Sequence, residues 1–151
     1  MALSWKEIHE LEVTGAYPQA IEALEARLSG ETFDPETVIR LGFNYWYCVV
    51  EKDVEDLKVP ADEYAKRFME LFDEYKALLA NHADFCWAFG LGMSLCWYYF
   101  PGATEEMGKE LLERSKALDP FWRNAFCATK EDKAKKLSGR GILSWYYNVT
   151  T

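Results

Sequence analysis

The sequence has few of the residue patterns on which catalysis and metal binding depend. It contains only two histidines, His9 and His82, and neither lies in an HExxH pattern or beside a nucleophile. The four cysteines form no CxxC pair and lack the spacing of zinc ligands. Gly90 and Gly92 lack the last glycine of a dinucleotide-binding loop and its preceding strand, so we interpret them as points of close helix contact. We therefore expect a protein that is not an enzyme and that uses no cofactor or metal.

The sequence also lacks a secretory signal and a membrane span. Residues 1–7 show no charged region followed by an apolar run. Residues 85–100 are rich in apolar side chains, but this stretch is shorter than the roughly 18 residues of a membrane helix and contains Gly90, Gly92 and Ser94. The cysteines lie among apolar or aromatic residues, which suits reduced and buried thiols. These features predict a cytoplasmic protein without membrane contact, in which residues 85–100 form a buried helix.

Positive charge is scarce. Seventeen basic side chains face 25 acidic ones, which gives a formal net charge of −8. Such a field repels nucleic acid and anionic membranes and attracts a cationic partner, although the same balance is also typical of an ordinary soluble protein. In contrast, half of the residues are hydrophobic and 16% are aromatic. We expect a substantial core and a single domain over residues 1–151.

Apolar residues at helical spacing divide the chain into an all-α arrangement. Helix-start signals support three helical hairpins at about residues 4–29, 34–80 and 83–119, with a cap and an aromatic tail over 120–151. The predicted caps are Ser4 with Glu7, Asp34 before Pro35, Asn81 or Asp84, and Thr104, and Asp119-Pro120 is predicted to end the last hairpin. Residues 51–58 form an insertion within the second hairpin.

Three segments resemble the tetratricopeptide repeat. They are Gly15-Ala16-Tyr17-Pro18-Gln19-Ala20-Ile21, the Leu-Gly-x-x-Tyr pattern at residues 41–45, and residues 111–120 with their closing Asp-Pro. The resemblance implies a short α-solenoid of about three hairpins with a C-terminal cap. The insertion at 51–58 departs from the family, whose repeat is about 34 residues.

The resemblance also implies a concave groove lined by the first helix of each hairpin, which holds a protein or peptide segment. Carried over to this sequence, the groove residues are Ile39, Phe43, Trp46, Tyr47, Phe89, Met93 and Trp97. Either Gly92 or Gly90 can take the place of the family's glycine, and a shift of two residues replaces the set in the third hairpin by Trp87, Leu91 and Leu95.

Aromatic residues at helical spacing are more often core than groove. However, residues 45–47 and 97–99 are two consecutive aromatic trios, and each spans about 200° of a helix. At least one member of each trio should therefore face a groove, a capping segment or solvent. The aromatic tail at residues 145–147 is an alternative occupant of the groove.

Acidic side chains form a second candidate surface that would steer a basic partner. Interleaved lysine and arginine also make an ordinary solvated surface a valid explanation. The candidates are Glu51, Asp53, Glu55, Asp56, Asp62 and Glu63.

These observations favour a non-enzymatic protein-binding module. A small, acidic chain with degenerate repeats resembles the immunity proteins that neutralise bacterial toxins, and that resemblance implies a cognate and basic toxin domain as partner. The alternatives are a peptide-binding scaffold or chaperone-like repeat protein, and an all-α enzyme with an unrecognised site.

Overall fold

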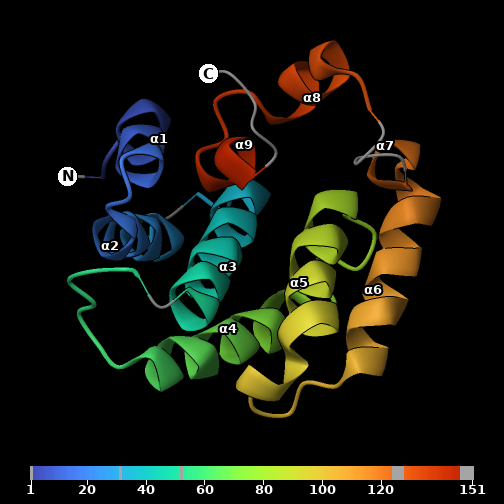
Figure 1. Cartoon of the computed structure of the whole chain (residues 1–151), viewed down its shortest axis with the longest axis horizontal. Helices are drawn as coiled ribbons and strands as arrows, with labels where there is room; N and C mark the ends of the chain where they lie inside the picture. Colours follow the sequence, from blue (N-terminus) through green and yellow to red (C-terminus); the bar gives the residue numbers. More distant parts are fainter. Residues whose placement is uncertain (1, 31, 52, 124–127, 147–151) are drawn as a thin grey trace.

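The structure is a computed structural model that describes residues 2–30, 32–51, 53–123 and 128–146. Within these residues the chain forms nine α-helices and one 3₁₀ helix and contains no strand (Figure 1). The predicted all-α class is confirmed.

Of the first four helices, the first and third begin at the predicted caps, whereas the fourth ends at Tyr75, before the predicted end of its hairpin at about residue 80. Ser4 caps the first by accepting a hydrogen bond from the Glu7 amide, while the Glu7 side chain accepts one from the Ser4 amide. The Asp34 side chain caps the third, which starts at Pro35. These helices are α1 (Trp5–Val13), α2 (Tyr17–Leu28), α3 (Pro35–Val50) and α4 (Ala61–Tyr75).

The second half of the chain departs from the predictions at two positions. The apolar helix ends at Cys96 and continues as a 3₁₀ turn instead of reaching Phe100. Its cap is His82, so the predicted caps Asn81 and Asp84 are wrong, because Asp84 is bound by side chains from the C-terminal part of the chain. The elements are α5 (Ala83–Cys96), η1 (Trp97–Tyr99), α6 (Glu105–Leu118), α7 (Pro120–Arg123), α8 (Lys130–Leu137) and α9 (Ile142–Tyr146).

The predicted signals at both ends of α6 are confirmed. Thr104 accepts a hydrogen bond from the Met107 amide at 3.1 Å, and the helix ends at Leu118. Asp119 then adopts an extended conformation, which is the conformation that a residue before proline favours.

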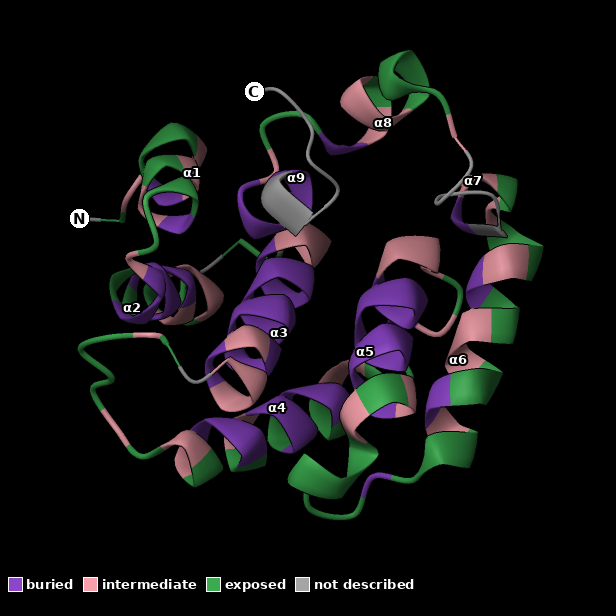
Figure 2. Cartoon of the chain, viewed as in Figure 1, coloured by how far each residue is buried: buried purple, intermediate pink, exposed green. Residues whose placement is uncertain are grey.

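Helix α3 lies at the centre of the fold. It contacts α2, α4, α5 and α9, and Figure 2 shows most of its length as buried. Burial of its apolar side chains on several sides makes this helix the main contributor to the core. Aromatic rings fill much of the space between α3, α4 and α5, as in the tilted pair of Phe68 and Phe89, whose centroids are 4.8 Å apart.

Glycines allow α5 to pack closely on two sides. A Cβ atom on Gly90 would lie 2.9 Å from the Leu111 Cβ of α6, and one on Gly92 would lie 2.9 Å from the Trp46 ring of α3. Gly108 of α6 backs directly onto the Ser94 backbone. The interpretation of Gly90 and Gly92 as close helix contacts is confirmed. Gly90 allows the approach of α6, and Gly92 allows the approach of α3.

Candidate functional site

Most of the predicted groove residues lie in the core. Their side chains are at most 7% exposed, because α3 and α5 pack against each other and against α4, and the set is Ile39, Phe43, Trp46, Phe89 and Met93. The expectation that these five residues line an open groove is therefore wrong for this fold. Trp87 and Leu91 of the alternative register are buried as well. The remaining candidates, Tyr47 and Trp97, reach the surface at two separate places.

The first place is an exposed apolar surface at the end of α5, which we call the aromatic turn. It consists of Leu95, Trp97, Tyr98 and Tyr99, with exposed fractions of 54%, 41%, 64% and 46%. The rings of η1 lie against one another outside the core: the centroids of Trp97 and Tyr98 are 5.7 Å apart, and those of Tyr98 and Tyr99 are 4.8 Å apart. Phe100 is 3% exposed and anchors the end of the turn. The prediction that part of this trio faces solvent is confirmed.

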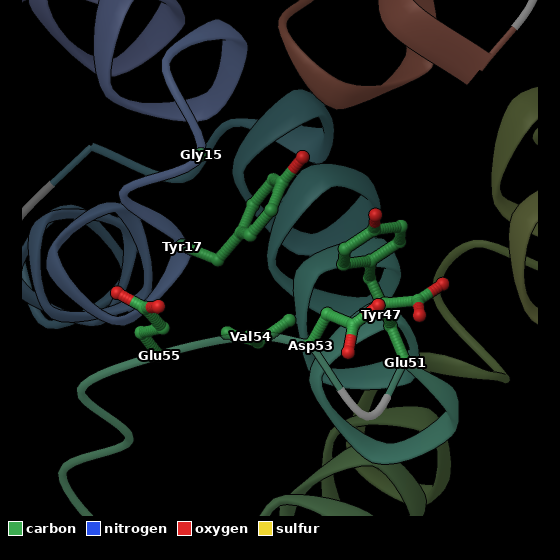
Figure 3. A pocket seen from close by; sticks show the side chains of 7 residues that line it. All are labelled: Gly15, Tyr17, Tyr47, Glu51, Asp53, Val54 and Glu55. Carbon is green, nitrogen blue, oxygen red and sulfur yellow. The ribbon is translucent and has the colours of Figure 1, made fainter.

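The second place is a cleft of about 440 Å³ between α2, α3 and the loop that follows α3, which we call the tyrosine cleft (Figure 3). The rings of Tyr17 and Tyr47 meet there with centroids 4.6 Å apart. In Figure 3, Tyr17 extends from α2 and Tyr47 from α3, and the loop passes below them. The acidic candidates Glu51, Asp53 and Glu55 complete the lining.

The tyrosine cleft has the chemistry of a site for a cation. Burial raises the pKa of Tyr17, and so does its hydrogen bond to Tyr47. Burial also raises the pKa of Tyr47, with Glu51 and Asp53 adding to the effect. Both phenols are therefore neutral at physiological pH. Among its described lining residues the cleft contains carboxylates and no basic side chain, which suits an incoming ammonium or guanidinium group.

The other acidic candidates are arranged differently. Asp62 and Glu63 lie at a second cleft of about 770 Å³, beside Arg67 and Pro101. Arg67 binds Glu63 at 3.3 Å and Glu25 at 3.0 Å, which neutralises much of this surface. Asp56 is exposed and lines neither cleft. The six acidic candidates therefore do not form one continuous site.

The histidines and cysteines of the described chain have structural contacts. The His82 imidazole caps α5, and His9 Nδ1 accepts a hydrogen bond from the Gly141 amide at 2.8 Å. Cys48 and Cys86 are buried thiols, whereas Cys127 lies outside the described residues. Among the described residues no group of three or more histidine, cysteine, aspartate or glutamate side chains could hold a metal ion.

Sequence reasoning missed a polar cluster that joins the C-terminal segment to the helices. Arg40 and Asn44 are buried on α3, one turn apart in an otherwise apolar helix, and both bind Glu12 of α1. The same carboxylate accepts a hydrogen bond from the Ile142 amide of α9. Two strongly polar residues at this spacing in an apolar helix were the available signal.

The aromatic tail returns to the helices as far as the structure describes it. The first residues of α9, Ile142 and Leu143, are fully buried, and α9 contacts α1 and α3. The side chains of Trp145 and Tyr146, and Tyr147 as a whole, lie outside the described residues. An aliphatic pair, rather than the predicted aromatic residues, provides the contact that can be described.

Comparison with protein-family models, with curated proteins and with solved structures finds no match for this chain. None of the described helices is both long and apolar enough to cross a membrane. The interpretation of the candidate site therefore rests on the geometry and charge of the chain itself.

Proposed function

We propose that this chain is a protein-binding module that recognises a basic protein, with the aromatic turn as its apolar anchor. The observation that carries the proposal is the exposure of four large apolar side chains at one turn. Their exposed surface is on the order of 400 Å², about half of what one partner buries in a standard protein interface. Tryptophan and tyrosine are also the residues that most often dominate binding energy.

The charge of the chain supports a basic partner. The formal net charge is −8, and the tyrosine cleft adds three carboxylates without a basic side chain among its described lining residues. Such a field raises the association rate of a cationic protein and makes that rate sensitive to salt. The partner then contributes a basic side chain to the cleft and an apolar one to the turn.

Within this class, we propose an immunity protein that binds and neutralises a basic toxin domain. Its architecture would be a short solenoid of tetratricopeptide-like hairpins, each helix pair being α1 with α2, α3 with α4, or α5 with α6. Contacts within these pairs and between α3 and α5 support that arrangement. The resemblance to immunity proteins is the second support, and under this proposal a neighbouring gene encodes the partner.

The test uses the C-terminal domain of a secreted protein encoded beside this chain. We expect Trp97→Ala and Tyr98→Ala each to weaken its binding by at least tenfold. Leu78→Ala is the matched control, because Leu78 is 67% exposed but lies outside the aromatic turn. Equal affinities for Trp97→Ala, Tyr98→Ala and Leu78→Ala would contradict the role of the turn.

Salt dependence tests the charge of the partner. Affinity should fall steeply as salt is added if the partner is basic, and Asp53→Asn should reduce the slope. An affinity that depends on Trp97 but does not change with salt would instead support a peptide-binding scaffold. A neighbouring gene that encodes no secreted toxin would contradict the immunity proposal.

A further inference from the structure

We propose that α1, α3, α5 and the end of α6 form a docking surface for a basic segment, which the C-terminal residues of the chain now occupy. The occupant is Lys136–Ser144, which we call the clip, and the surface it covers is the acceptor surface. The acceptor side chains are His9, Glu12, Glu36, Asp84 and Asp119. We infer that a partner segment with an arginine, then glycine, then two aliphatic residues binds there when the clip leaves.

The clip supplies two cations to carboxylates on three helices or their ends. Arg140 donates from Nε and Nη2 to the two Glu36 oxygens at 2.9 and 2.8 Å, which is bidentate geometry. Its Nη2 also lies 3.1 Å from Asp84. Lys136 Nζ lies 2.7 Å from Asp119 and 3.3 Å from Asp84. These contacts recognise an arginine and a lysine at a fixed spacing.

The acceptor surface also binds the backbone of the clip. The Gly141 amide donates to His9 Nδ1 at 2.8 Å, and the Ile142 amide donates to Glu12 Oε2 at 3.0 Å. Gly141 has a φ of +59°, and a Cβ atom there would collide with Arg40 and Glu12. The surface therefore requires glycine directly after the arginine.

The next two positions require aliphatic side chains. Ile142 and Leu143 are both 0% exposed, and Figure 1 shows α9 above α3, next to α1. The clip is braced internally, since Ser144 Oγ accepts a hydrogen bond from the Arg140 amide at 3.0 Å and donates one to the Leu137 carbonyl. A short segment can thus hold its binding conformation, which lowers the entropic cost of docking.

The negative charge of the acceptor surface indicates which kind of partner segment can replace the clip. Removal of the clip would take Arg140 away from Glu36 and Asp84, and Lys136 away from Asp84 and Asp119. Arg40 lies 3.9 Å from Glu36 but is already paired with Glu12. A bare acceptor surface would leave partly buried carboxylates without counter-charge, which is unfavourable. A basic segment restores that balance, so the surface selects the same class of partner as the proposed function.

The segment that leads into the clip is weakly packed, whereas the clip itself buries Leu137, Ile142 and Leu143. The preceding helix α8 is rich in charged residues, and Leu137 is its only buried residue. Elements with few buried apolar contacts open more readily than the core of the same protein. Opening therefore starts in α8, and a partner that replaces the clip has to cover the sites of Ile142 and Leu143 with its own two aliphatic residues.

The test uses the full chain and a labelled synthetic peptide of residues 136–144. Arg140→Ala weakens the clip but leaves every acceptor side chain in place. We expect the Arg140→Ala chain to bind the peptide at least tenfold more tightly than the wild-type chain does. Lys135→Ala, an exposed substitution next to the clip, should bind as the wild type does. A peptide with glycine 141 replaced by alanine should not bind either chain.

A folded Arg140→Ala chain that gains no affinity for the peptide would overturn the proposal. If that variant does not fold, hydrogen exchange of the wild-type chain decides the question. Exchange of the Gly141 and Ile142 amides well before the central amides of α3 supports a separable clip, and exchange together with them overturns it. This proposal rests on the proposed function in that both invoke a basic partner. Trp97 lies in the aromatic turn and not in the acceptor surface, so Trp97→Ala should not affect peptide binding. Failure of one proposal can therefore be distinguished from failure of the other.

Discussion

Arg40 and Glu12 form an ion pair inside the protein, with side chains that are 2% and 0% exposed. Arg40 Nε and Nη2 both donate to Glu12 Oε1. Glu12 Oε2 accepts hydrogen bonds from Asn44 Nδ2 at 3.1 Å and from the Ile142 amide at 3.0 Å. One carboxylate therefore joins α1, α3 and α9 and is the close ion-pair partner of Arg40.

Replacing Glu12 by alanine should destabilise the protein by about 3–5 kcal/mol, because the buried Arg40 guanidinium loses its close partner and keeps only the more distant Glu36, at 3.9 Å. Urea unfolding followed by circular dichroism measures the change in free energy. Glu22→Ala is the control, since Glu22 is exposed on α2 and its replacement should cost less than about 0.5 kcal/mol. Equal midpoints for the two variants would show that the ion pair contributes nothing.

Helix boundaries were predictable where the signal is local. Ser4 and Glu7 cap each other across three residues, and Pro35 directly follows its cap. Arg40 is conspicuous as a polar residue in an apolar helix, but its partner Glu12 lies 28 residues away, so no local pattern identifies the pair. Asp84 is a second case in which a local pattern does not identify the partners of a residue. Its position near a helix start predicts a cap, whereas its actual partners lie far along the chain.

The candidate site was predictable only in part for a similar reason. Helical spacing shows that the aromatic residues of α3 cannot all face one stripe, but it does not show how many elements surround the helix. With α2, α4, α5 and α9 around it, α3 buries Phe43 and Trp46 together. The aromatic turn is exposed because α5 ends at Cys96. No proline or glycine stands at that break, so the sequence does not predict it.

Gly108→Ala should destabilise the protein, although alanine normally stabilises a helix relative to glycine by about 1 kcal/mol. The new Cβ would meet the Ser94 backbone of α5, which cannot move without separating α5 from α6. We expect a net loss of about 2 kcal/mol, measured by thermal or urea unfolding.

Gly102→Ala is the control for that experiment. No atom lies within 4 Å of a Cβ at Gly102, but its φ is +81°, so the expected loss of about 1 kcal/mol comes from backbone strain alone. A stabilised Gly108→Ala variant would contradict the close approach of α5 and α6.

Asp84 should make stability depend on pH in the acidic range. Burial alone would raise the pKa of its carboxyl, but Arg140, Lys136 and a hydrogen bond from Trp122 outweigh burial and hold the pKa below its ordinary value. The folded state thus binds this proton less readily than the unfolded state does. The stabilisation is full above the ordinary aspartate pKa of about 4 and is lost as the pH falls through the lower, folded pKa.

The measurement compares wild type with Asp84→Asn by urea unfolding at several pH values. At pH 7 the wild type should be more stable by roughly 1–3 kcal/mol, and the difference should stay constant to about pH 5 and shrink below pH 4. Asp73→Asn should show a small difference throughout, since the Asp73 side chain is 59% exposed. A difference that grows on acidification would mean that burial dominates the pKa of Asp84.

Cys48 should resist alkylation in the folded protein. Burial raises the pKa of its thiol to about 12, and its side chain is 2% exposed, so both the thiolate and the access of a reagent are limited. At neutral pH the thiolate fraction alone should slow its reaction about 1,000-fold relative to an ordinary cysteine. Mass-spectrometric mapping after N-ethylmaleimide treatment should show modification of the half-buried Cys96 before Cys48, and modification of both in urea. If Cys48 reacts as fast as Cys96 without denaturant, the α3 environment opens on the timescale of the reaction and the core around this helix is less stable than its burial implies.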